Sequence, residues 1–155
     1  MGEIMGSGGV IAQTIQLALA PVFVLVAIGN IMNILSTRLG RVVDRSRVLQ
    51  SLHASTTGAE HDAVVREIRT VDRRIAMIGR AILLLVLSGL AIGVCVVLLF
   101  LEEIAQVSLQ HFAAAAFIVA IGLLMSALLL FMRETQHATA VLRIPRTYLE
   151  LDRKL

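Results

Sequence analysis

Three long segments without a charged side chain restrict the folds that are open to this sequence. They are Ile4–Thr37, Ala81–Leu101 and Ile104–Met132, and none of them contains Asp, Glu, Lys or Arg. A helix needs about 20 apolar residues to cross a hydrocarbon core about 30 Å thick. Because the bilayer core has no water to bind the backbone, such a segment crosses it as a helix. We therefore predict an all-α integral membrane protein with three transmembrane helices.

The composition agrees with a membrane environment. Of the 155 residues, 57% are apolar and only 16% are charged, and the mean hydropathy is +0.86. A soluble domain of this length seldom needs so much apolar surface. We predict a single membrane domain over residues 1–155, with spans at about 11–36, 80–101 and 111–132 and a C-terminal tail over 133–155.

The distribution of basic residues predicts the orientation. Nine of the fourteen Lys and Arg residues lie in Arg38–Arg80, and the other five follow Met132. The start of the chain and the loop between the second and third spans carry only acidic residues, namely Glu3, Glu102 and Glu103. Cytoplasmic loops are enriched in Lys and Arg. The sequence therefore predicts a multi-pass protein with its N-terminus outside and its C-terminus inside. The pI near 10.0 does not indicate a nucleic-acid partner, because the basic residues flank the spans.

The segment between the first two spans is predicted to be a cytoplasmic antiparallel helical hairpin over residues 38–78. No strong helix breaker occurs early in this segment, so the first helix should run from near Val10 to about Leu52. The stretch His53–Ala59 contains the Ser, Thr and Gly residues of a turn. The helix that follows has apolar residues at helical spacing and continues into the second span.

Two related motifs, RVVDR and RTVDR, begin at Arg41 and Arg69 in the two arms of this hairpin. If the arms fold back about the middle of the His53–Ala59 turn, Arg41 lies opposite Asp72. The same register places Asp44 opposite Arg69. Exposed ion pairs contribute only about 0–1 kcal/mol each. We therefore expect the two pairs to set the register of the hairpin more than its stability.

A polar face on the first helix suggests a functional role. Asn30, Asn33, Thr37, Arg41 and Asp44 fall within an arc of about 80° at 3.6 residues per turn. Asparagines inside a span are costly unless they meet a partner helix or water. Both explanations stay open: interhelical hydrogen bonds, or a water-filled pore between subunits with an apolar constriction. The residues that would line the pore are Gln16, Leu19, Phe23, Val26, Asn30, Asn33 and Thr37.

Two functions from different classes follow from this pattern. Three spans are few to enclose a pathway, so a pore requires a homo-oligomer. In that hypothesis Glu102 and Glu103 lie at the outer mouth and favour inorganic cations. The alternative is a non-conducting scaffold or regulatory subunit whose basic hairpin binds anionic lipid or a partner.

No catalytic motif is present. The sequence contains no HExxH, GxxxxGK[ST], GxSxG or CxxC. His53 and His61 flank the hairpin turn but make a weak metal site without further ligands. The lone cysteine, Cys95, is expected to be an apolar filler. We therefore predict no enzyme activity, no catalytic residue, no metal site and no cofactor, with the bilayer and further copies of the chain as the main partners.

Three stretches carry a family resemblance: ALAPVFVLVAIGNIMNILSTRLGRVVDRSRVL, RRIAMIGRAILLLVLSGL and LLLFMRE. They resemble a small bacterial family of three-span membrane proteins of unknown function, with TRLxRVVDRxR after the first span as its signature. The likeness covers about residues 17–145. It implies an integral membrane protein and supplies no activity. We expect the protein in the bacterial cytoplasmic (inner) membrane.

Overall fold

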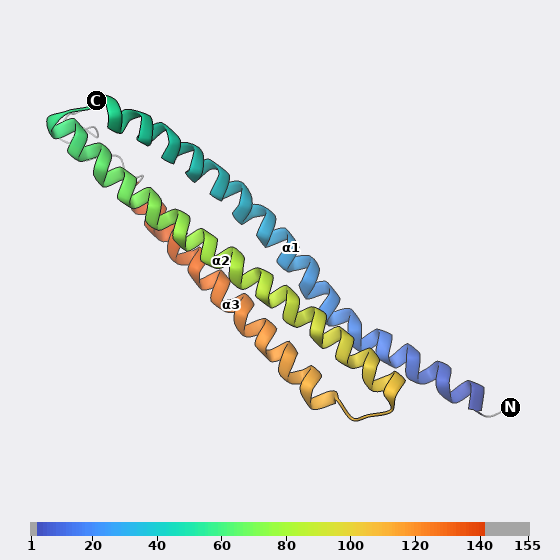
Figure 1. Cartoon of the computed structure of the whole chain (residues 1–155). Coiled ribbons are helices and arrows are strands. Elements are labelled where there is room, and N and C mark those ends of the chain that lie inside the picture. Colours follow the sequence, from blue (N-terminus) through green and yellow to red (C-terminus); the bar gives the residue numbers. More distant parts are fainter. Residues whose placement is uncertain (1–2, 142–155) are drawn as a thin grey trace, which may run out of the picture.

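The structure consists of three long helices. The computed structural model describes the backbone of residues 3–141 and the side chains of Gln13 and residues 15–136. The helices are α1 (Glu3–Ser55), α2 (Gly58–Ala105) and α3 (Gln110–Val141), and no strand occurs in the described part (Figure 1). All three are long and apolar enough to cross a membrane. The predicted all-α class is therefore confirmed for the described residues, as are three helices able to span a membrane.

The expected spans at 11–36, 80–101 and 111–132 each lie within one of these helices. The first helix begins at Glu3, before the Val10 start expected from the sequence. Glycine lowers helix propensity by about 1 kcal/mol per residue without forbidding a helix. The predicted tail begins as a continuation of α3, and residues 142–155 lie outside the described residues.

α1 and α2 run antiparallel and are joined by a short turn at Thr56 and Thr57 (Figure 1). The backbone N–H and the hydroxyl of Thr56 both donate to the Leu52 carbonyl, at 3.0 and 2.9 Å. Gly58 opens α2 with φ +66, a left-handed conformation that favours glycine. The turn lies inside the predicted His53–Ala59 segment.

The interface between α1 and α2 is built from rows of buried side chains that repeat every seven residues. This spacing keeps one seam of each helix against its neighbour, as in a coiled coil. On α1 the row is Pro21, Ile28, Leu35, Val42 and Leu49; on α2 it is Val64, Val71, Ile78, Leu85 and Ile92.

Two contacts fix the register of this interface. Arg45 pairs with Glu67 at 2.7 Å, and a methyl group placed on Gly89 would meet the Leu25 side chain at 3.5 Å. The members of each pair are almost equidistant from the turn. The two helices are thus aligned without a register shift from the hairpin end into the apolar segment.

The interface between α2 and α3 also repeats every seven residues, but with smaller side chains. On α2 the row is Arg74, Ala81, Ser88 and Cys95; on α3 it is Ala113, Ala120, Ala127 and Glu134. The Ser88 hydroxyl donates to the Ala120 carbonyl at 2.7 Å. Small residues let two helix backbones approach closely, which is how many membrane helices pack.

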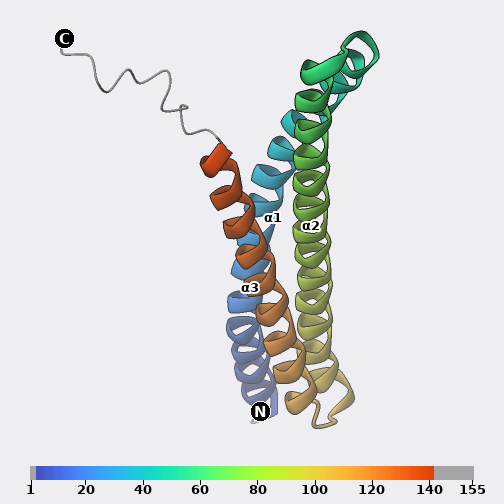
Figure 2. The ribbon, with the colours of Figure 1, turned by 90° about the vertical axis from the view of Figure 1, so that its left-hand side faces the viewer.

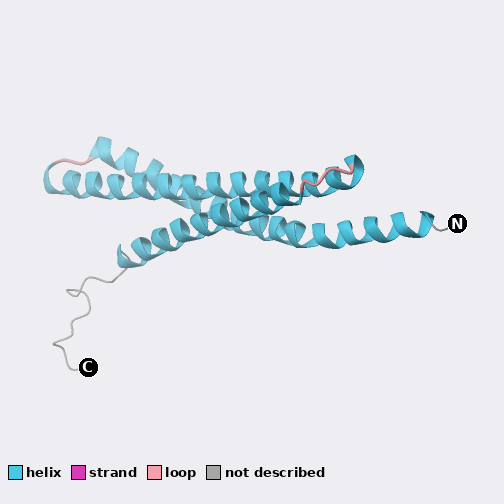
Figure 3. Ribbon diagram, turned by 90° about the horizontal axis from the view of Figure 1, so that it is seen from below, coloured by secondary structure: helices cyan, strands magenta, loops and turns pink. Residues whose placement is uncertain are grey.

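The hairpin extends beyond the third helix. With 53 residues, α1 is about 80 Å long at 1.5 Å per residue, more than twice a hydrocarbon core of about 30 Å. Figure 2 shows the N-terminal end of α1 and the α2–α3 loop at one end and the hairpin turn at the other. Seen from below in Figure 3, α3 diverges from the hairpin toward its C-terminal end. The α1–α2 arms therefore project past the described end of α3.

Candidate functional site

The three helices meet at a charged cluster near the hairpin side of the apolar segments. Glu134 on α3 has only 1% of its side chain exposed. Its Oε1 accepts hydrogen bonds from Nη2 and Nε of Arg74 on α2, at 2.9 and 3.1 Å. Its Oε2 lies 3.1 Å from Nη2 of Arg38 on α1, as an ion pair without good hydrogen-bond geometry. One buried carboxylate thus links all three helices.

Two neighbours on α3 hold the Arg38 guanidinium in place. Its Nη1 donates to the Thr135 hydroxyl at 3.2 Å, and that hydroxyl donates to the Phe131 carbonyl at 2.9 Å. The guanidinium carbon also lies 5.2 Å from the centre of the Phe131 ring, within the range of a cation–π interaction. Two arginines against one carboxylate leave the cluster with a net positive charge.

The α2–α3 packing explains why Arg74 reaches Glu134. Arg74 precedes Ser88 by fourteen residues, and Glu134 follows Ala120 by the same number. Because the helices are antiparallel, the register set by the Ser88–Ala120 hydrogen bond also aligns Arg74 with Glu134. The ion pair therefore lies at the end of a continuous row of small residues.

Sequence reasoning missed this cluster. The predicted site residues do not include Arg38, Arg74 or Glu134, because the prediction rests on the charges of the RVVDR and RTVDR motifs. A usable signal was present: alanines at 113, 120 and 127 repeat every seven residues, and Glu134 occupies the next place.

The structure corrects the predicted ion pairs of the hairpin. Among the described side chains, neither Arg41–Asp72 nor Asp44–Arg69 forms an ion pair, and all four are exposed. Instead, Asp44 lies 3.8 Å from Arg47 within α1, and the ion pair between the arms is Arg45–Glu67 among the described side chains.

The direction in which each side chain points around its helix axis explains why the predicted pairs do not form. The valine in each motif, Val42 or Val71, is buried at the α1–α2 seam. Each residue turns the helix by about 100°, so Asp72 points well away from the seam, and Asp44 and Arg69 point further still. The four residues are at matching heights, but their side chains do not face one another.

The predicted pore-lining residues share one exposed face of α1. Phe23 is 69% and Val26 is 59% exposed, and Gln16, Leu19, Asn30, Asn33 and Thr37 are exposed too. The Thr37 hydroxyl donates to the Asn33 carbonyl at 3.0 Å. The side-chain amides of Asn30 and Asn33 have no hydrogen-bond partner in the described part of the chain. This face is turned away from α2.

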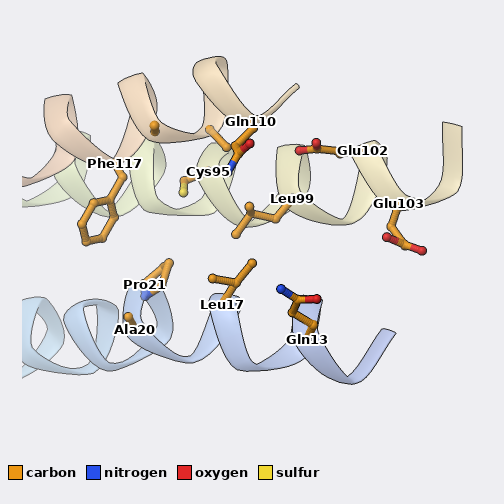
Figure 4. A pocket seen from close by; sticks show the side chains of 12 residues that line it. Gln13, Leu17, Ala20, Pro21, Cys95, Leu99, Glu102, Glu103, Gln110 and Phe117 are labelled. Atoms are coloured by element: carbon orange, nitrogen blue, oxygen red, sulfur yellow. The ribbon is translucent and has the colours of Figure 1, made fainter. Parts of the chain in front are cut away.

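The two predicted outer-mouth residues lie elsewhere. Glu102 and Glu103 border a cavity of about 400 Å³ between α1, the C-terminal part of α2 and the N-terminal part of α3 (Figure 4). Its lining is Gln13, Leu17, Ala20 and Pro21 from α1, Cys95, Leu99, Glu102 and Glu103 from α2, and Gln110, Ala113, Ala114 and Phe117 from α3. At 3.6 residues per turn, this side of α1 is roughly 150° from the Asn30–Asn33 face.

The two histidines at the hairpin turn lie against each other. The rings of His53 and His61 are tilted by 54°, with their centres 4.4 Å apart. Within the described residues, no group of three His, Cys, Asp or Glu side chains is placed to hold a metal ion.

Comparison with known protein families matches residues 18–144 to the family described as protein of unknown function (DUF2721). The chain belongs to the DUF2721 family. The match includes Arg38, Arg74 and Glu134, and it confirms the resemblance to a family of unknown function; the TRLxRVVDRxR signature stays a prediction. No curated protein and no solved structure matches the chain. With its three apolar helices, this DUF2721 chain is a multi-pass membrane protein.

Proposed function

We propose that the protein forms a homo-oligomer in which the α1 helices line an ion-conducting pore. The observation that carries this proposal is the pair of unpartnered amides, Asn30 and Asn33, on the exposed face of α1. The proposal places the protein in the bacterial inner membrane. Its hairpin and C-terminus lie in the cytoplasm, following the distribution of Lys and Arg.

The cost of burying polar groups supports an assembly. An amide without a hydrogen bond costs roughly 2–7 kcal/mol in an apolar medium, and α1 already uses its opposite side to pack on α2. Within the described part of one subunit, Asn30 and Asn33 are exposed. In a ring of subunits, these amides form hydrogen bonds either with water in the pore or with an amide of the neighbouring subunit. The three helices of one subunit cannot enclose a water-filled pathway by themselves.

The order of side chains along this face fits a gated pore. Asn33 and Thr37 form a polar end, while Phe23 and Val26 form an apolar stretch in the middle of the span. Hydrophobic constrictions gate channels by losing water. The proposed outer end of α2 contributes Glu102 and Glu103, and residues 81–132 contain no Lys or Arg, so the outer end attracts cations. These two carboxylates act at a distance, since they border the cavity rather than the α1 face.

Flux through reconstituted vesicles tests the proposal. Asn33→Leu extends the apolar stretch, so ion flux should fall by at least about tenfold while the oligomer keeps its size on a sizing column. Asn33→Asp should increase the preference for cations. As a matched control, Val94→Leu changes an apolar position that is 54% exposed on α2 and should leave flux unchanged. Wild-type vesicles without flux under varied ions and voltages would rule out conduction.

The second candidate is a non-conducting scaffold that holds anionic lipid or a partner at its basic hairpin. The net positive Arg38–Arg74–Glu134 cluster, at the edge of the apolar segments, favours it. Juxtamembrane basic residues attract anionic lipids by about 1 kcal/mol each. If Asn33→Leu dissociates the oligomer and the wild type conducts nothing, the amides are interhelical contacts and the scaffold is the better explanation.

A further inference from the structure

The cavity at the outer ends of the helices has the features of a binding site. Its volume of about 400 Å³ is within the range of small-molecule pockets, about 300–1,000 Å³. Its walls come from all three helices. Figure 4 shows Leu17 and Leu99 facing each other across the space, with Phe117 and Pro21 deeper inside. The interior is therefore apolar, and the polar groups are concentrated at one end.

The polar end carries uncompensated negative charge. Glu102 and Glu103 are half-buried, and within the described part of the chain their carboxylates form no ion pair. No Lys or Arg occurs in residues 1–37 or 81–132, and His111 is the one histidine of these segments. Gln13 adds an amide toward the same end, and Gln110 adds another nearer Cys95 and Leu99 (Figure 4). A cation would complement these groups.

We infer that this cavity binds a lipophilic organic cation, with the positive charge at Glu102 and Glu103 and the apolar body between Leu17, Leu99 and Phe117. A bare metal ion does not fit this lining, because apolar walls cannot replace its water shell. The volume suits a compact ligand with a single apolar body. The site uses none of the residues that line the proposed pore, since it lies on the opposite side of α1; the two proposals share only Glu102 and Glu103.

A pair of probes with the same shape and opposite charge tests the inference. Radiolabelled tetraphenylphosphonium should bind saturably to the full-length protein in nanodiscs of zwitterionic lipid, above the level of empty nanodiscs. Tetraphenylborate has the same four phenyl groups and a negative charge, and it should show no saturable binding. The phosphonium centre donates no hydrogen bond, so the two carboxylates would hold it by charge alone. Glu103→Gln and Glu102→Gln each remove one of these charges and should each weaken phosphonium binding roughly tenfold.

Two further variants separate the cavity from a general charge effect. Ala114→Phe places a large side chain into the cavity without changing the charge, and it should abolish saturable binding. Glu60→Gln removes an exposed carboxylate at the far end of α2, and it should leave binding unchanged. Asn33→Leu should also have no effect, which makes failure of the pore and failure of this site distinguishable.

Several outcomes would overturn the inference. Absence of saturable phosphonium binding would do so, as would equal binding of the borate probe or unchanged binding in both glutamine variants. If Ala114→Phe alters the oligomer size and the wild type binds no phosphonium, the cavity is filled by a neighbouring subunit. Circular dichroism of each variant verifies that the helices are intact.

Discussion

Glu134 is a carboxylate with 1% of its side chain exposed, and guanidinium groups from two other helices hold it. Burial of a single charge is costly, but a paired charge is stabilised by its partners. Arg38 is held further by Thr135 and Phe131. At the scale of residues, this cluster decides where the ends of the apolar segments sit relative to one another.

Removing the carboxylate should therefore destabilise the protein strongly. Glu134→Ala leaves two arginines facing each other without an anion, and breaking a buried pair typically costs about 3–5 kcal/mol. Thermal unfolding in neutral detergent, followed by circular dichroism, should show a much lower midpoint than the wild type. Glu60→Ala, at an exposed carboxylate on α2, provides the control. A Glu134→Ala midpoint equal to that of the control would show that the cluster adds nothing to stability.

At the scale of elements, α2 uses two different seams. Toward α1 it presents branched apolar side chains such as Val71, Ile78 and Leu85, and toward α3 it presents Ala81, Ser88 and Cys95. The smaller side chains allow a close approach. This approach lets the Ser88 hydroxyl reach the Ala120 carbonyl. The size of the side chains along each seam of α2 thus determines which helix packs there: α1 on the branched seam and α3 on the small-residue seam.

Enlarging one residue of the small seam should separate α2 from α3. Ala120 is fully buried, and adding methylene groups to a packed interface costs about 1–3 kcal/mol. Ala120→Leu should lower the unfolding midpoint and increase proteolysis of the α2–α3 loop. The matched variant Ala115→Leu changes an exposed alanine on the same helix and should resemble the wild type. Equal behaviour of the two variants would contradict close packing at Ala120.

At the scale of the whole molecule, the positive and the negative charges lie at opposite ends of the apolar segments. The hairpin carries the nine Lys and Arg residues of Arg38–Arg80, whereas the C-terminal end of α2 carries Glu102 and Glu103. The arms of the hairpin also extend past the described end of α3 (Figure 2). This polarity is the physical basis for the proposed orientation.

Thiol labelling in intact cells tests that orientation. In a Cys95→Ala background, a cysteine at Thr57 in the hairpin turn should resist an impermeant maleimide. A cysteine at Gln106 in the α2–α3 loop should react with it. Permeabilised cells serve as the control, because both positions should then react. Labelling at position 57 and protection at position 106 would reverse the proposed topology.

The sequence by itself was sufficient to predict the three helices and the turn near Thr56. The signals for these elements are local: uncharged segments of about 20 residues or more and a cluster of turn residues. They can be recognised without knowledge of the tertiary structure. The midpoint of the hairpin could also be located, and the observed Arg45–Glu67 pair lies close to that register. The positions of residues along each helix were thus predictable.

Only the tertiary structure decided which side of each helix faces its neighbours. The charges of RVVDR and RTVDR suggested the pairs Arg41–Asp72 and Asp44–Arg69, but burial of Val42 and Val71 turns those side chains outward. The same packing directs Arg38 and Arg74 toward Glu134, a residue sixty positions beyond Arg74. Opposite charge alone allows several pairings between side chains at the same level of the hairpin. Close packing of the apolar rows allows only one rotation of each helix about its axis, and this rotation selects the pairs.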